Sequence, residues 1–153
     1  MKWKERWCTV IAGVLLLSAV HVVEAVMPPD VYSRMSEQSK IKATAVVEEV
    51  KTLEITRQST WKSVVFSLKH PMSKGVPEKF SGTCYSVDHE WQQAPAGGTI
   101  YFYPEKGDLV YVTVAADGGS ITSYTYLNDV MESLFIDNAE KIRYGMGNAW
   151  LDL

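Results

Sequence analysis

Few side chains in this sequence could do covalent chemistry, and the first of them is the thiol of Cys84. His70 and His89 are the imidazoles that could act with it. A thiolate nucleophile needs a nearby base or positive charge that lowers its pKa, and the residues that flank Cys84 supply neither. We therefore expect Cys84 to be a buried, small apolar residue with a free thiol, and we assign no catalytic residue. Pairing of Cys84 between two chains is the other use open to it.

Three potential metal ligands follow one another at Asp88, His89 and Glu90. Neighbouring side chains of an extended chain point to opposite sides, so this run could hold one ion only with a tight turn and further ligands. The motifs GxSxG, HExxH and CxxC do not occur in the sequence. These observations predict a solvated loop, no bound metal and no cofactor.

Aromatic side chains are a richer feature, because they could bind a ligand without any covalent step. Rigid rings provide contact area at a low cost in conformational entropy. Alternation in an extended chain places Tyr101 with Tyr103, and Tyr124 with Tyr126, on common faces. The competing interpretation is that these tyrosines are cross-strand packing partners. The candidate binding residues are Trp61, Trp91, Tyr101, Tyr103, Tyr124 and Tyr126.

The first residues of the chain indicate export. A basic start at residues 2–6 precedes an apolar run from Val10 to Val20, which at about eleven residues is too short to span a bilayer. Small residues then stand at 23 and 25, where a signal peptidase would read them. We predict a signal peptide over residues 1–25 with cleavage after Ala25, a periplasmic or secreted location, and membrane contact only through the uncleaved signal.

Residues 26–153 have a length that suits a single domain with a core of its own. Cys84 is the only cysteine in this part, so no internal disulfide can form and the fold must depend on apolar packing. The full chain has 15 basic and 18 acidic side chains, a net charge of −3. Residues 26–153 contain no cluster of Lys and Arg, which argues against a nucleic-acid partner.

The stretch from Gly97 to Leu127 is rich in aromatic and β-branched residues, which favour strands. Turn signals at residues 104–107 and 117–119 divide it into three expected strands of a meander, of which the first runs from Thr99 to Tyr103. The middle strand, starting at Leu109, is apolar on both faces. We expect it within a sheet that another layer covers.

Earlier in the chain, the segment Ile41–Ile55 fits helical spacing as well as alternation. We predict a strand because β-branched residues favour it, with a bulge at Glu48-Glu49 where the alternation changes register. Trp61–Leu68 is the expected second strand. Phe80–Val87, which contains Gly82, is the expected bent or edge strand.

Two helices are expected at the ends of this region. The first is short, with Asp30 as its N-cap, and runs to about Gln38. The second begins at Asn128 or Asp129 and continues or restarts through Ile142 until Gly145, and a tail that buries Trp150 follows. Its expected apolar face consists of Val130, Met131, Leu134 and Phe135.

The order of these elements across residues 41–127 resembles an OB-fold type barrel of five or six strands, in a mainly β domain with a C-terminal helix. The pattern from Ile41 to Val87 is similar to that of the exported netrin-like and metalloproteinase-inhibitor domains. That family relies on several disulfides and, in its inhibitors, on an N-terminal cysteine, whereas the expected mature chain begins at Val26 and has one cysteine. Inhibitor function is therefore not expected. A β-sandwich or a lipocalin-like cup is the alternative architecture.

These observations predict an exported, non-catalytic binding or adaptor module. Its partner would be an envelope or secreted protein, a peptide or a glycan, held by an aromatic barrel face and the loops at residues 72–79 and 88–98. Two alternatives remain open: a small cell-envelope enzyme that uses Cys84 and His89, and a structural subunit of an envelope assembly that docks through a sheet edge or the C-terminal helix.

Overall fold

The computed structural model describes residues 27–153, and the predicted signal peptide lies outside the described residues. Within this range the chain is mainly β. The elements in chain order are α2 (Pro29–Glu37), β1 (Ile41–Ile55), β2 (Thr60–Pro71), β3 (Lys79–Ser86), β4 (Leu109–Val114), β5 (Ile121–Tyr126), α3 (Asp129–Asp137), a 3-10 turn (Ala139–Lys141), β6 (Ile142–Gly145) and β7 (Asn148–Leu151).

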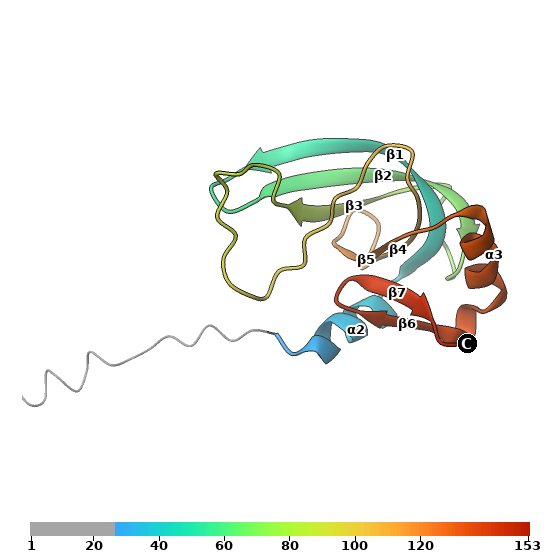
Figure 1. The fold of residues 1–153 in the computed structure, drawn as a ribbon. Coiled ribbons are helices and arrows are strands. Elements are labelled where there is room, and N and C mark those ends of the chain that lie inside the picture. The colour runs from blue at the N-terminus through green and yellow to red at the C-terminus, as the bar shows by residue number, and fades with distance from the viewer. Residues whose placement is uncertain (1–26) are drawn as a thin grey trace, which may run out of the picture.

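Five of the strands form one antiparallel sheet in the order β3-β2-β1-β4-β5, and β6 and β7 form a separate hairpin (Figure 1). The sheet curls until its two edges meet at one point. There the Thr83 amide donates to the Gly119 carbonyl at 2.8 Å, and the Gly118 amide donates to the Ser81 carbonyl at 2.9 Å. The ladder itself is not closed into a barrel.

β1 is the long bent strand that the sequence predicts, and it pairs with β2 on one side and β4 on the other. Its pairing with β2 changes register between Val47 and Glu49, which confirms the predicted bulge at Glu48-Glu49. Two further shifts occur, between Thr44 and Ala45 and between Thr52 and Glu54. Because each bulge adds bend and twist, three of them explain how one strand follows the curvature of the whole sheet.

β4 is buried on both faces, as its sequence predicts. Val110, Val112 and Val114 enter the main core inside the curled sheet. Tyr111 and Thr113 lie on the other face, where α2, α3 and the β6–β7 hairpin cover the sheet (Figure 1). A second, smaller core forms there from Tyr111, Phe135, Ile142 and Ala149.

The prediction of a strand at Thr99–Tyr103 is wrong. Only Tyr101 makes a bridge, and it is an isolated parallel one to Tyr85 of β3. β4 already pairs with β1 and β5, so it has no free edge to offer to this segment. Pro104 follows and has no N–H to extend a ladder.

The predicted second helix is too long. Asn128 is its N-cap, with its side chain accepting from the Met131 amide at 2.8 Å, but the helix ends at Asp137. Ile142, predicted on the helix, begins β6. Trp150 lies on β7 and is half exposed instead of buried, while Ala149 takes the buried place.

The predicted apolar face of this helix is also mostly exposed. Phe135 is buried, whereas Val130, Met131 and Leu134 remain accessible.

At the other end of the described residues, the N-cap of α2 is Pro28 and not Asp30. Asp30 stands in the first turn and pairs with Arg34 at 3.0 Å.

Candidate ligand-binding site

Three aromatic side chains form a row across neighbouring backbone segments. Trp61 of β2 lies opposite Tyr85 of β3 in the antiparallel register. Tyr85 in turn bridges to Tyr101 in the segment before β4. Directly paired residues of a sheet carry their side chains on the same face. Trp61, Tyr85 and Tyr101 therefore make up one surface feature, which we name the aromatic row.

Two rings of the aromatic row, those of Trp61 and Tyr85, lie close together and reach solvent. The ring centroids of Trp61 and Tyr85 are 6.4 Å apart, and the ring planes differ by 20°. The two residues are 36% and 45% exposed. Soluble proteins rarely leave large apolar groups exposed in contiguous sets, and such sets mark interaction sites. The aromatic row is therefore a candidate interaction surface.

A hollow of about 280 Å³ opens beside the aromatic row. It combines two aromatic rings with side-chain amide and hydroxyl groups, and none of its lining residues is charged. These polar groups could hydrogen-bond a ligand whose flat face lies on a ring. Its lining residues are Gln58, Ser59, Tyr85, Pro95, Thr99 and Tyr101.

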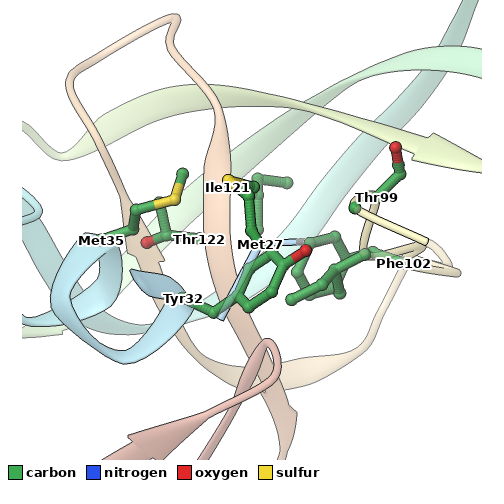
Figure 2. A pocket seen from close by; sticks show the side chains of 9 residues that line it. Met27, Tyr32, Met35, Thr99, Phe102, Ile121 and Thr122 are labelled. Atoms are coloured by element: carbon green, nitrogen blue, oxygen red, sulfur yellow. The ribbon is translucent and has the colours of Figure 1, made fainter. Parts of the chain in front are cut away.

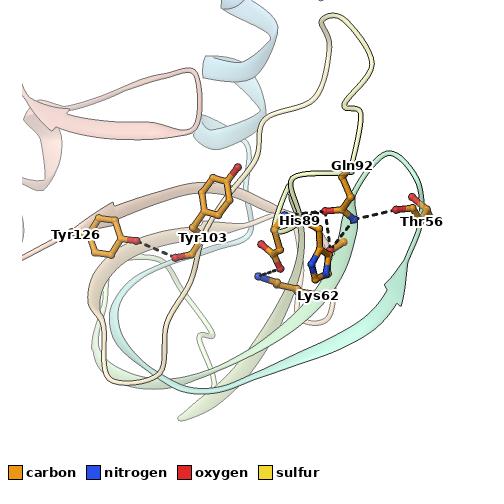
Figure 3. Close-up of polar contacts among 8 residues, drawn as sticks. Thr56, Lys62, His89, Gln92, Tyr103 and Tyr126 are labelled. Atoms are coloured by element: carbon orange, nitrogen blue, oxygen red, sulfur yellow. Dashed lines mark hydrogen bonds and ion pairs between the residues drawn. The ribbon is translucent and has the colours of Figure 1, made fainter.

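A buried glutamine holds the loop that contributes Pro95 to this hollow. The Oε1 atom of Gln92 accepts hydrogen bonds from the amides of Asp88 at 2.9 Å and His89 at 3.2 Å. Its Nε2 atom donates to the Thr56 carbonyl at 3.1 Å and to the Thr60 hydroxyl at 3.1 Å (Figure 3). One side chain therefore joins the β3 exit loop to the β1–β2 turn, which carries Gln58 and Ser59 of the hollow.

Behind the aromatic row, an ion pair closes the same end of the sheet. Lys62 Nζ lies 2.8 Å from Asp88 Oδ2 (Figure 3). Burial alone would raise the pKa of the Asp88 carboxyl, but the hydrogen bond and charge of Lys62 outweigh it and hold that pKa below its ordinary value. The Asp88 carboxylate therefore forms a close ion pair with Lys62 at this end of the sheet.

Cys84 is buried, as predicted, on the inner face of β3 opposite Lys62 in the register. Burial raises the pKa of the thiol to about 11, although the nearby Lys62 charge acts in the opposite direction. The thiol is therefore protonated at neutral pH and is a poor nucleophile.

The structure does not bring Cys84 and His89 together as a catalytic pair. The His89 ring instead stacks on Trp91, with centroids 5.1 Å apart. No hydrogen bond among residues 27–153 joins Cys84 to an imidazole, and His70 lies exposed near the end of β2. In the same range, no three His, Cys, Asp or Glu residues gather as a metal site would require.

A second hollow, of about 150 Å³, lies next to the first and shares Tyr101 with it. Tyr101, Tyr103, Tyr124 and Tyr126 line it together with Met146 of the β6–β7 turn, and we name this hollow the tyrosine cup. Tyr103 and Tyr126 are half exposed, and the Tyr126 hydroxyl donates to the Tyr103 carbonyl at 3.1 Å (Figure 3).

Tyr124 is the buried wall of the tyrosine cup. Its hydroxyl donates to Asp108 Oδ2 at 2.7 Å, and its ring meets the Tyr126 ring edge to face at 5.4 Å. Burial and the Asp108 carboxylate raise the pKa of Tyr124 far above its ordinary value, so the hydroxyl stays protonated and remains a donor. Tyr124 is therefore a packing residue that shapes the cup.

The structure divides the six aromatic residues that the sequence predicts for binding among the aromatic row, the tyrosine cup and the 88–98 loop. Trp61 and Tyr101 belong to the aromatic row, and Tyr103, Tyr124 and Tyr126 join Tyr101 in the tyrosine cup. Trp91 lines neither hollow.

Tyr85 is the site residue that the sequence analysis misses. The signal was present, because a buried Cys84 in a strand implies that the next side chain, Tyr85, points outward. Its pairing with Trp61 depends on the β2–β3 register, which the sequence alone does not fix.

A third hollow, of about 150 Å³, lies where α2 crosses the end of the sheet. Met27, Tyr32 and Met35 face it from the N-terminal side, and Phe102 and Ile121 complete an apolar lining (Figure 2). Its polar groups are few and do not converge on one point, so we assign it no ligand.

Comparison of the chain with protein-family models, with curated proteins and with solved structures found no match. Within residues 27–153, no helix combines the length and apolar character that crossing a bilayer requires.

Proposed function

We propose that this protein is an exported, non-catalytic binding module whose aromatic row and adjoining hollow bind a glycan chain. The observation that carries the proposal is the exposed stack of Trp61 on Tyr85 beside a hollow with uncharged polar walls. Sugar rings present an apolar face of C–H groups and an edge of hydroxyls. The first suits an aromatic ring, and the second suits amide and hydroxyl partners such as those of Gln58 and Ser59.

Three further features support this function. The basic start and apolar run of residues 1–25 are typical of a signal peptide. The Gln92 hydrogen bonds hold the hollow in a preformed state, which lowers the entropy cost of binding. The protonated, buried Cys84 leaves this region without an activated nucleophile.

The curled sheet with touching edges supports an OB-like barrel as the underlying architecture.

The direct test is isothermal titration calorimetry of the protein against short, soluble, neutral oligosaccharides of α-linked and β-linked hexoses. We expect at least one series to bind. Trp61→Ala should weaken that binding about tenfold, which corresponds to about 1.4 kcal/mol, because Trp61 is the largest exposed ring of the aromatic row and its loss removes a stacking surface.

Trp150→Ala is the matched control, since Trp150 is also half exposed but lies on β7, outside the aromatic row. It should leave affinity unchanged. Glycan binding that is absent from every series, or that falls equally in both variants, would contradict the proposal. Binding of short peptides in place of glycans at Trp61 would also contradict it.

A further inference from the structure

The tyrosine cup has a composition that the glycan proposal does not use. Aromatic residues make up most of its lining, and none of its lining residues carries a charge. Tyr103 and Tyr126 leave about half of their surface open to the hollow and to solvent. The face of an aromatic ring carries negative electrostatic potential, so several rings around one space favour a positive guest.

Two carboxylates add negative potential to the same place. Asp108 Oδ2 accepts a hydrogen bond at 2.7 Å from the hydroxyl of Tyr124, which lines the cup. Burial raises the pKa of the Tyr126 hydroxyl, and the charges of Asp108 and Glu105 add to this effect. Neither carboxylate forms an ion pair among the described residues. The two carboxylates lie outside the lining of the cup, as does the exposed Lys106 between them in sequence, so they act on a guest from behind the rings.

The cup is also held rigidly. The Tyr124 amide donates to the Gly147 carbonyl at 2.9 Å, which ties the β6–β7 turn to β5. A Cβ atom at Gly147 would lie 2.7 Å from Ile100 and 3.0 Å from Phe102, so the turn backbone packs directly on the floor of the cup. Tyr126 is fixed to the Tyr103 carbonyl. The rings therefore do not need to reorganise around a guest.

We propose that the tyrosine cup binds an organic ammonium group through cation–π contacts, with Asp108 and Glu105 supplying the counter-charge. The protein already uses such a contact elsewhere, since Lys42 Nζ lies 5.7 Å from the centre of the Tyr144 ring. The volume of about 150 Å³ suits a small quaternary or primary ammonium head. This inference stands apart from the glycan proposal, because it depends on Tyr103 and Tyr126 and not on Trp61.

The test compares choline with its neutral carbon isostere, in which a tert-butyl group replaces the trimethylammonium group. The two probes have nearly the same shape, so only the charge differs. We expect choline to bind with a dissociation constant about tenfold lower than that of the isostere, measured by titration in NMR or calorimetry at low salt. Equal or tighter binding of the isostere would overturn the proposal, as would no binding of choline.

Substitutions identify the groups responsible. Tyr126→Leu keeps an apolar side chain and removes the ring, so it should reduce the preference for choline, whereas Tyr126→Phe keeps the ring and should retain that preference. Glu105→Gln, on an exposed side chain, should weaken choline binding about threefold and reduce its dependence on salt. Unchanged choline affinity in Tyr126→Leu would contradict the assignment.

Trp61→Ala is the control that separates this inference from the glycan proposal. It should leave choline affinity unchanged while glycan affinity falls. If the protein binds choline but no glycan, the cation site is supported and the proposed glycan function is contradicted. If it binds glycan but not choline, the glycan function is supported and the cation site is contradicted. If Trp61→Ala and Tyr126→Leu weaken choline binding equally, the cation lies on the aromatic row and the assignment to the cup is wrong.

Discussion

Individual tyrosines of similar sequence context take different roles in this protein. Tyr124 and Tyr126 stand two residues apart on β5, yet the first is buried against Asp108 and the second is half exposed. Alternation correctly predicts that they share a face. It cannot predict which of them the β6–β7 turn covers, because that turn comes from a distant part of the chain.

Cys84 carries a residue-scale prediction that depends on pH. Its pKa is about 11 in the folded protein against an ordinary 9.0, so the unfolded chain gives up the thiol proton first as pH rises. Folding stability should therefore fall between about pH 9 and 11, by on the order of 3 kcal/mol from this group. Urea unfolding measured near neutral pH and at about pH 10.5 would detect the loss.

Cys84→Ala is the control, since it keeps every tyrosine that titrates in the same range. The variant should lose less stability between the two pH values than the unaltered protein. Parallel losses in both proteins would show that the thiol is not the cause.

Cys84→Ser should also leave ligand binding unchanged.

At the scale of the element, the β6–β7 hairpin is the part that the sequence analysis does not predict. Ala139 and Ile142 continue a helical spacing, so local pattern extends the helix. The structure instead buries Ile142 of β6 and Ala149 of β7 in the second core. The turn places Met146 at φ 49° and Gly147 at φ 80°, a left-handed pair without the Asn-Gly or Asp-Gly sequence that usually marks it.

Gly147→Ala should lower the free energy of unfolding by more than the cost of placing alanine at the left-handed φ of this position. The left-handed φ costs about 1 kcal/mol, and the close contact of a new Cβ with Ile100 and Phe102 should add about 2 kcal/mol. Chemical denaturation measures the sum. Gly118→Ala has the same φ of 80° but its Cβ would meet nothing closer than 3.9 Å, so it should show only the first cost. Equal losses in the two variants would contradict the role given to the turn.

For the whole molecule, composition and alternation were enough to predict a mainly β domain, its long bent first strand and a strand, β4, that is buried on both faces. They could not predict the meeting of the sheet edges, because that depends on bulges summed along β1 and on one small residue. A Cβ atom at Gly82 of β3 would lie 2.6 Å from Ile121 Cγ1 of β5. The sequence marks Gly82 only as a bend, whereas the structure uses it for close approach.

Gly82→Ala should therefore separate the two edges. The amides of Thr83 and Gly118, which bridge them, should exchange with solvent at least about tenfold faster, while β1 amides paired with β4 stay protected. Hydrogen exchange followed by NMR resolves these groups. Adding Ile121→Ala, which removes the clashing carbon, should restore slow exchange at both positions. Unchanged exchange in Gly82→Ala would mean that the edges are held by other contacts.

The central claim is that ligand binds along Trp61, Tyr85 and Tyr101. The most direct measurement is an NMR titration with a neutral oligosaccharide that follows the indole N–H signals of Trp61, Trp91 and Trp150, which lie on the aromatic row, on the 88–98 loop and on β7. We expect the Trp61 signal to shift in a saturable way while the other two remain in place. A saturable shift confined to Trp91 or Trp150, or no shift with any glycan series, would contradict it.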